Sequence, residues 1–387
     1  TTSRQMSPHV VMNETTLGRG VVDGFAPGEL ERREAANERG CGQALVGRLL
    51  KACLDRDIEP LTGHRAVELI LDDHRVVGVV FETDAGGREV RADKGVVLAT
   101  GGFEHNRDLV RSFIRGPLTR TVAVDTNTGD GLKMAMRVGA ALGNMQEAWW
   151  VPCIDVPDDD GEVFPWMVNR ERVRPRCIMV NRAGVRFANE ASNYNAFGAA
   201  FHQLDAGSFE YSNLPAYMVF DHEYAVRWGV YNYHGEGVVP TWLVSGETLE
   251  ELAIQIDVNP SGLADTVGRW NAISEDLDDP DFGRGRSVND IHWGDSRSRG
   301  PDATLGPIDT PPYYAVEVHP GALGTKGGPR TTVDAQVVDL DGTPIEGLYA
   351  AGNVMASAMG MTYGGAGGTL GPGMVFGFLA GRDVARA

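Results

Sequence analysis

Residues 95–106 read GVVLATGGFEHN, and this stretch decides the fold of the chain. Its apolar run Val96–Ala99 is typical of a short buried strand, and the small residues Thr100-Gly101-Gly102 follow directly. Glycine at the end of a strand lets backbone N–H groups approach a pyrophosphate or a planar ring. We therefore expect an α/β domain with a ligand site at the end of this strand.

The end of the chain repeats this design twice. The apolar segment Leu348–Ala350 is followed by residues 351–353 (AGN), and residues 363–371 read YGGAGGTLG ahead of a helix expected from about Pro372. A helix that starts beyond such a run points the positive end of its dipole at a ligand. One glycine loop is an ordinary turn, but three of them favour a dinucleotide or flavin site.

One motif of such sites is missing. A dinucleotide site normally rests its pyrophosphate on a G-x-G-x-x-G turn after the first strand of the domain. Four glycine pairs each lack the third member: they are Gly18-x-Gly20, Gly40-x-Gly42, Gly129-x-Gly131 and Gly283-x-Gly285. Either the site does not hold such a cofactor, or the first strand–helix–strand unit of the domain is not encoded in this chain.

The composition excludes several classes of function. The formal net charge is −18, and so acidic a chain repels the phosphate backbone of a nucleic acid. No apolar run approaches the roughly 20 residues that span a bilayer. No residues have metal-ligand spacing, and the four cysteines form no Cys-x-x-Cys pair. We therefore expect no metal, no membrane span and no nucleic-acid partner, with reduced thiols in a cytoplasmic protein.

The sequence also changes in character along its length. Residues 42–57, GQALVGRLLKACLDRD, carry apolar side chains at helical spacing, and three β-branched runs between residues 64 and 98 predict strands. Residues from about 151 to 325 are richer in Trp, Tyr, Asn and Pro, and their periodicity is weaker. This shift suggests a second domain inserted into the first.

Five motifs in order carry a resemblance to a known family. They are VVLATGGFEHN from Val96, NTGDGLKMAMRVGAAL from Asn127, IMVNRAGVRFANE from Ile178, LGTKGGPRT from Leu323 and GTPIEGLYAAGNVMAS from Gly342. Together they resemble the fumarate reductase/succinate dehydrogenase flavoprotein superfamily, and within it the 3-ketosteroid Δ1-dehydrogenase branch. The similarity runs from about Arg65 to the C-terminus.

The resemblance implies FAD as the cofactor and an α/β fold. We expect a Rossmann-like FAD-binding domain in residues 1–155 and 325–387, incomplete at its N-terminus and interrupted by an α+β catalytic domain in residues 156–324. The family's G-x-G-x-x-G segment would then lie on a second polypeptide, or have been removed, or be omitted from the sequence. The expected FAD-binding residues are Ala66, Ala99, Thr100, Gly101, Gly102, Asp130, Gly352, Asn353, Gly368, Thr369 and Leu370.

Substrate-binding positions distinguish the branches of this superfamily. Fumarate reductases hold a dicarboxylate with a histidine in an H-T-M-G-G motif, where this chain has Gly324. Two arginines of those enzymes correspond to the pair Tyr363-Gly364 and to Tyr194. A dicarboxylate would lose its charge-assisted hydrogen bonds here, which are the strong ones. The ketosteroid branch carries tyrosines at both places, so the resemblance favours an apolar ketone or steroid as substrate.

These tyrosines suggest a reaction. The phenol of Tyr363 and the backbone N–H of Gly367 are expected to polarise a carbonyl as an oxyanion hole does, which acidifies the neighbouring C–H. Tyr194, as a phenolate, would take that proton, and the adjacent carbon would give hydride to flavin N5. Because tyrosine ordinarily titrates near 10, the pKa of Tyr194 would have to be lowered, or its proton passed on.

Other interpretations remain open at this stage. The same flavin chemistry could run as an ene-reductase on another substrate, or the chain could be a non-catalytic subunit that binds no flavin alone. Tyr363 and Tyr194 could be structural hydrogen-bonding tyrosines, and Trp149-Trp150 is expected to belong to the core. Lys326 and Arg330 are expected to be surface charges near the domain hinge.

Overall fold

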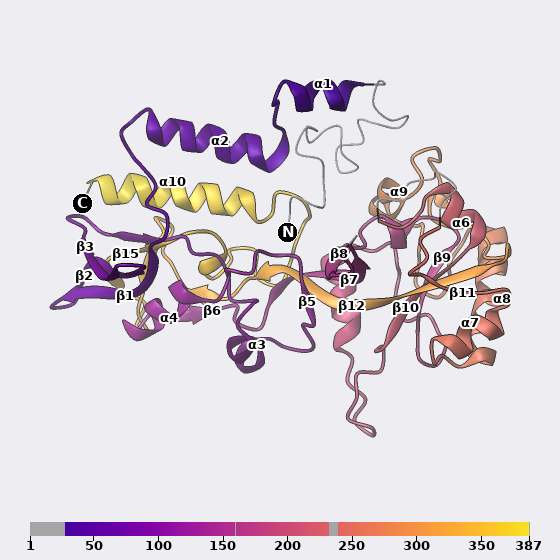
Figure 1. Cartoon of the computed structure of the whole chain (residues 1–387). Helices are drawn as coiled ribbons and strands as arrows, with labels where there is room; N and C mark the ends of the chain where they lie inside the picture. Colours follow the sequence, from indigo (N-terminus) through magenta and orange to yellow (C-terminus); the bar gives the residue numbers. More distant parts are fainter. Residues whose placement is uncertain (1–27, 159, 232–238, 387) are drawn as a thin grey trace.

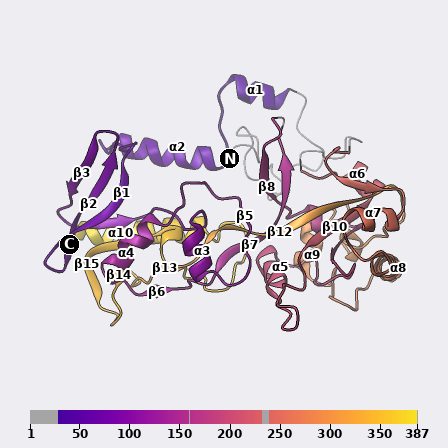
Figure 2. The ribbon, with the colours of Figure 1, turned by 60° about the horizontal axis from the view of Figure 1, so that its bottom comes forward.

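The computed structural model describes residues 28–158, 160–231 and 239–386 of the chain. The Gly18-x-Gly20 pair lies outside the described residues. Figure 1 shows two lobes, one built from both ends of the chain and the other from its middle, and Figure 2 shows the same lobes from another side. The mixture of helices and sheets agrees with the expected α/β class.

Two three-stranded sheets form the first lobe, together with a two-stranded sheet of β6 (Leu142–Gly143) and β13 (Gly328–Pro329). One is an antiparallel meander of order β1-β2-β3, and the other has the order β14-β15-β4. Within the second sheet β15 and β4 are parallel, with Ala350 opposite Leu98. The strands are β1 (Arg65–Asp72), β2 (Arg75–Thr83), β3 (Gly86–Arg91), β4 (Val96–Leu98), β14 (Gln336–Val338) and β15 (Pro344–Ala350).

A seven-stranded sheet forms the centre of the second lobe. Its path is β8-β7-β12-β10-β9, with β5 and β11 paired to β12. The long β12 runs from this lobe into the first (Figure 1). The strands are β5 (Arg120–Thr121), β7 (Ala148–Pro157), β8 (Val163–Met167), β9 (Cys177–Asn181), β10 (Ala216–Asp221), β11 (Val244–Gly246) and β12 (Tyr313–Thr325).

Helices surround these sheets. The expected helix in residues 42–57 is present as α2 (Cys41–Leu54), whereas the C-terminal helix α10 (Leu370–Arg386) starts two residues earlier than expected. The earlier start follows from the Gly371 N–H, which donates to the carbonyl of Gly367. The other helices are α1 (Glu29–Ala35), α3 (Arg107–Phe113), α4 (Asp130–Arg137), α5 (Tyr194–Gly198), α6 (His222–Arg227), α7 (Leu249–Gln255), α8 (Pro260–Asp276) and α9 (Val288–Trp293).

Buried ion pairs accompany the apolar core of the second lobe. Arg186 pairs with Glu190 at 2.8 Å and with Asp279 at 3.0 Å, and Arg284 pairs with the same Glu190 at 3.0 Å. All four side chains are buried, and both guanidinium groups lie over the Trp270 ring. Because each charge has an opposite partner, the cost of desolvation is offset. This network holds α8 and the following loop against β9.

The first lobe leaves large apolar side chains exposed on α2, β4 and α10. No residue of α2 is buried, and Ala380 is the one buried residue of α10. Figure 1 draws α2 and α10 on the same side of this lobe. We call this surface the apolar face and define it by Val46, Leu49, Leu50, Leu54, Val97, Leu370, Met374, Val375 and Phe378. Exposed apolar surface of this kind usually marks an interaction site.

No helix in the described part of the chain is long and apolar enough to cross a bilayer.

Close backbone packing beneath the site gives a test of this fold. A Cβ on Gly328 would lie 1.8 Å from the carbonyl oxygen of Val354, so Gly328→Ala must displace one backbone from the other. We expect it to lower the free energy of unfolding by roughly 1–3 kcal/mol or more, measured by thermal unfolding followed by circular dichroism. Gly377→Ala is the matched control, because its Cβ would meet open space and alanine favours a helix. An unchanged melting temperature for Gly328→Ala would contradict this packing.

Candidate active site

The site begins where β4 and β15 end. The two strands are parallel, and the Ala351 N–H donates to the carbonyl of Leu98 at 2.9 Å. Residues 99–102 and 351–353 therefore leave the sheet at the same edge. The structure thus brings together two of the three expected glycine loops, as the carboxyl ends of parallel strands require.

The glycines after β4 pack closely against protein atoms. A Cβ on Gly102 would lie 2.3 Å from both the Thr325 hydroxyl and the Glu104 carboxylate, and one on Gly101 would lie 2.3 Å from the side chain of Asn127. Gly101 also has a φ of +76°. These two glycines are therefore needed for the path of the chain itself.

Asp130 and Ala66 form a second group of expected cofactor residues. Arg65 donates to the two Asp130 carboxylate oxygens at 2.9 and 3.1 Å, and these hydrogen bonds lower the pKa of Asp130. Ala66 follows Arg65 on β1 and packs on the core of the first lobe. A Cβ on Gly131 would lie 2.2 Å from the Thr100 hydroxyl, so the start of α4 lies against the end of β4.

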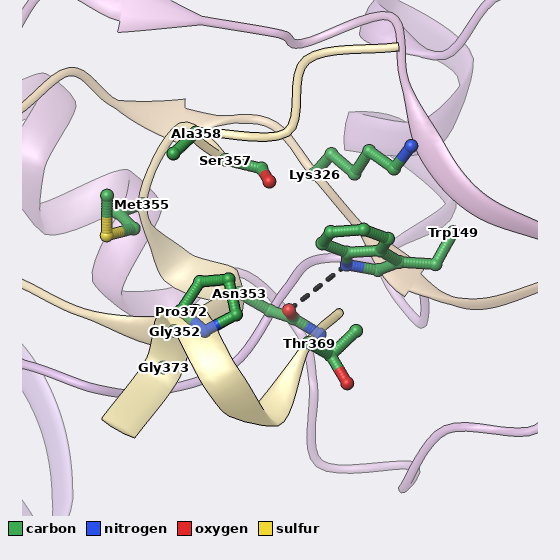
Figure 3. A pocket seen from close by; sticks show the side chains of 10 residues that line it. All are labelled: Trp149, Lys326, Gly352, Asn353, Met355, Ser357, Ala358, Thr369, Pro372 and Gly373. Carbon is green, nitrogen blue, oxygen red and sulfur yellow. Dashed lines mark hydrogen bonds between the residues drawn. The ribbon is translucent and has the colours of Figure 1, made fainter. Parts of the chain in front are cut away.

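A shallow hollow that opens to solvent lies at the start of α10. Figure 3 shows its wall: Trp149, Lys326, Gly352, Asn353, Met355, Ser357, Ala358, Thr369, Pro372 and Gly373. Three of these, Gly352, Asn353 and Thr369, are expected FAD-binding residues. The indole N–H of Trp149 donates to the Asn353 side-chain oxygen at 3.1 Å, which fixes that amide at the edge of the hollow.

This wall is suited to FAD. Gly352 in this wall has a φ of +76°, and Gly365 and Gly367 in the glycine loop just before α10 have φ values of +124° and +93°. A Cβ on any of these three glycines would meet open space. Their backbone is therefore uncovered, as a surface for a flat or phosphorylated group must be. The start of a 17-residue helix and one buried cation, Lys326, add positive potential that suits an anionic cofactor. Leu370 begins this helix.

Three aromatic side chains from both lobes meet next to the hollow. The centroid of the Tyr363 ring lies 4.7 Å from that of Trp149 and 5.3 Å from that of Tyr194, and both ring pairs are arranged edge to face. Tyr363 and Tyr194 are only 7% and 6% exposed. A Cβ on Gly368 would lie 2.6 Å from the Tyr363 ring, so this ring packs directly on the glycine loop. The two expected catalytic tyrosines are thus in contact, although they are 169 residues apart in the sequence.

The ionisation of Tyr194 distinguishes the two alternatives left open by the sequence, a lowered pKa or a proton passed on to another group. Burial raises the pKa of Tyr194, and the hydrogen bond with Tyr363 raises it further. The charge of Arg172 acts in the opposite direction but more weakly. In this structure Tyr194 is therefore a neutral phenol, whereas direct proton abstraction needs a phenolate.

The structure also corrects the expectation for Lys326. Its side chain is fully buried, lies 4.6 Å from the centroid of the Trp149 ring, and lines the hollow. Only Arg330 is exposed, as expected. The burial of Lys326 could not be read from the sequence. Its position beside Gly327-Gly328 was the one local sign that it could lie in a closely packed segment. Trp149, expected in the core, is buried but also forms part of the wall of the hollow.

The chain belongs to the FAD binding domain family, whose model matches residues 24–370. The match confirms FAD as the expected cofactor. The match also begins earlier than Arg65, where the motifs of the resemblance first become recognisable in the sequence.

Individual relatives confirm the ketosteroid dehydrogenase resemblance. The 4-oxocyclohexanecarboxylate 2-dehydrogenase of Sinomonas cyclohexanicum is 41% identical over 373 residues, 95% of this chain and 64% of that protein. The 3-oxosteroid 1-dehydrogenase of Mycobacterium tuberculosis H37Rv is 39% identical over 365 residues, 89% of this chain and 63% of that protein. This chain therefore spans less than two thirds of the length of these relatives.

A solved structure agrees with these relatives. The 3-ketosteroid Δ1-dehydrogenase from Sterolibacterium denitrificans, in complex with 1,4-androstadiene-3,17-dione, matches with a TM-score of 0.81 at 38% identity. The match covers 87% of this chain and 61% of that one.

The protonation of Tyr194 can be measured directly. We expect Tyr194→Phe to leave the tyrosinate absorbance rise between about pH 9 and 11 unchanged, because the wild-type phenol does not ionise in this range. The measurement is a spectrophotometric titration of the folded chain, with circular dichroism to define the pH range in which it stays folded. A rise that is smaller by one tyrosine in the variant would show that Tyr194 does ionise there.

Proposed function

We propose that this chain is the larger part of an FAD-dependent dehydrogenase that introduces a C=C bond beside the carbonyl of a cyclic ketone, either a 3-ketosteroid or a smaller ring. The observation that carries the proposal is the contact of Tyr363 with Tyr194 on the glycine loop at the start of α10. It places two phenols and uncovered backbone next to the hollow that suits FAD. The ring ketones named in the relatives' activities agree with this chemistry.

In this reaction, each residue of the site would have a separate role. Tyr363 and the N–H of Gly367 donate to the substrate carbonyl, which stabilises negative charge on its oxygen and acidifies the neighbouring C–H. Tyr194 accepts the proton that leaves that carbon. FAD, when bound, would accept the hydride from the next carbon. Since Tyr194 is a neutral phenol in this structure, it must first pass its own proton to another group.

The domain organisation forms part of the same proposal. We propose a Rossmann-like FAD-binding domain in residues 1–155 and 325–387, interrupted by an α+β catalytic domain in residues 156–324. The pairing of β15 with β4 supports it, because the two strands come from opposite sides of the interruption. We also propose a cytoplasmic location, since the cysteines Cys41, Cys53, Cys153 and Cys177 are free thiols.

An ene-reductase that runs hydride in the opposite direction is the alternative. It would use the same loops, and a relative named NADH:acrylate oxidoreductase from Vibrio harveyi is 27% identical over 368 residues. Gly324 and the two tyrosines argue against a dicarboxylate substrate, because no cationic side chain stands at these three positions.

We propose that a strand–turn–helix unit with the G-x-G-x-x-G motif, in the same polypeptide or in a second one, completes the FAD site by covering the apolar face. In the described residues β4 pairs with β15 on one side, and its Val97 is 38% exposed. A strand added beside β4, followed by a glycine turn and a helix, would cover the side chains of α10 and bring the absent G-x-G-x-x-G turn to the edge where β4 and β15 end. More than a third of each relative's length is unmatched by this chain, which leaves room for such a unit.

The role of Tyr363 is tested with FAD-loaded protein. We expect Tyr363→Phe to retain the visible flavin spectrum and to lose turnover by about 10²–10³-fold, the effect of removing one oxyanion donor. The assay follows anaerobic bleaching of the flavin by 4-androstene-3,17-dione and by 4-oxocyclohexanecarboxylate. Bleaching by either ketone supports the dehydrogenase, whereas reoxidation of reduced flavin by an enone alone supports the reductase. Normal turnover in Tyr363→Phe would exclude this tyrosine from the mechanism.

Docking on the apolar face is tested with a defined partner. The part of the Sinomonas dehydrogenase that this chain leaves unmatched is expressed separately, mixed with this chain and FAD, and examined by sedimentation and visible absorbance. We expect a one-to-one complex that retains flavin, and loss of both signals in Phe378→Glu. Val288→Glu is the matched control, because Val288 is 86% exposed on the other lobe. Absence of a complex, or an equally stable complex with Phe378→Glu, would overturn the proposal.

A further inference from the structure

Lys326 is a buried cation without an anionic partner in the described part of the chain. Its side chain is fully buried, and no ion pair joins it to a carboxylate there. The charge of Glu147 acts on it, but the Glu147 carboxylate pairs with Arg115 at 3.6 Å. Burial lowers the pKa of Lys326 to about 8. An unpaired charge at such a position costs stability, so a lysine there needs another explanation than packing.

The three N–H donors of the ammonium have neutral acceptors. They reach the carbonyl oxygens of Met361 and Thr362, both at 3.1 Å, and the Asn195 side-chain oxygen at 3.4 Å. Asn195 in turn donates its amide N–H to the carbonyl of Met361 at 3.2 Å. Lys326, Asn195 and the turn at residues 361–362 therefore form a closed set of hydrogen bonds.

These contacts join the two tyrosines through their neighbours in the chain. Thr362 directly precedes Tyr363, and Asn195 directly follows Tyr194 at the start of α5. The Tyr363 ring itself lies 6.0 Å from the ammonium, and the face of Trp149 covers the ammonium at 4.6 Å. One charge thus lies between the two segments that carry the phenols.

We propose that Lys326 is a positioning residue whose ammonium ties the turn before Tyr363 to helix α5 and so keeps the two phenols in contact. The importance of this contact for catalysis rests on the proposed function, whereas the tie itself does not. The N-terminal end of the same turn is held without the Lys326 side chain, because the Ser357 N–H donates to the backbone carbonyl of Lys326 at 3.0 Å. Loss of the side chain would therefore release residues 359–363 without detaching the whole segment.

The tie depends on pH in a defined direction. Below about pH 8 the ammonium is charged and donates to all three acceptors; above it the amine is neutral and holds the carbonyls less strongly. The titratable groups around it are Glu147, Tyr363 and Tyr194. Because Lys326 binds its proton less tightly in the folded than in the unfolded chain, its contribution to the free energy of unfolding rises from about pH 8 to about pH 10.4. As the pH rises from about 8 to about 10.4, the free energy of unfolding should therefore increase, while the hydrogen bonds from Lys326 to the turn become weaker.

The experiment compares wild type with Lys326→Met on the flavin-free chain, so that it does not depend on any activity. Hydrogen exchange by mass spectrometry monitors the Gly360 and Thr362 amides, which donate within the turn to the carbonyls of Ser357 and Met359 at 3.2 and 3.1 Å. We expect exchange there to be about tenfold faster in Lys326→Met at pH 7, at an unchanged or higher melting temperature. Arg330→Met, which removes an exposed cation four residues away, is the matched control and should change neither.

Wild type alone provides a second measurement. After correction for intrinsic rates, protection of the same amides should fall as the pH rises through about 8, and Lys326→Met should lack this step. Two results would overturn the proposal. One is unchanged exchange of residues 359–363 in Lys326→Met. The other is a general loss of protection with a lower melting temperature, which would make Lys326 an ordinary structural residue.

Discussion

The ladder of hydrogen bonds along β12 is the constraint on which the site depends. Its first half pairs with β10 in the second lobe, and its second half pairs with β7 and β5 toward the first. The strand ends at Thr325, whose hydroxyl accepts from the Phe103 N–H just after the β4 glycines. Lys326 is the next residue. A single strand thus fixes the distance between the lobes, and this distance brings Tyr194 on α5 to Tyr363 beside α10.

The sequence predicted local secondary structure well, and it predicted properties that depend on burial poorly. The strand before Thr100, the helix in residues 42–57 and the glycine run after Tyr363 could be anticipated, because periodicity and glycine content are local. The pairing of Tyr363 with Tyr194 followed from a family resemblance, since no local pattern links residues so far apart. The burial of Lys326 was missed, and the choice between a lowered pKa and a neutral phenol at Tyr194 stayed open, because both depend on desolvation by burial, which is a property of the folded environment.

In the proposed function, flavin binding and catalysis use neighbouring but different parts of the site. The hollow uses backbone and small side chains from the ends of β15 and the start of α10, whereas the phenols project from the adjoining contact between the lobes. Replacing either phenol by phenylalanine keeps the ring that packs at this contact, so we expect such changes to leave the wall around Gly352 and Thr369 in place. Changes at Gly352, with its φ of +76°, would act on the wall itself.

The apolar face has a consequence for the colloidal behaviour of the chain. A net charge of −18 makes two copies repel each other at long range, although each exposes Val375, Phe378 and the leucines of α2. Added salt screens that repulsion within about 10 Å at 0.1 M, while apolar attraction persists. We therefore expect copies of the isolated chain to associate more readily as the ionic strength rises, and to do so first through the apolar face.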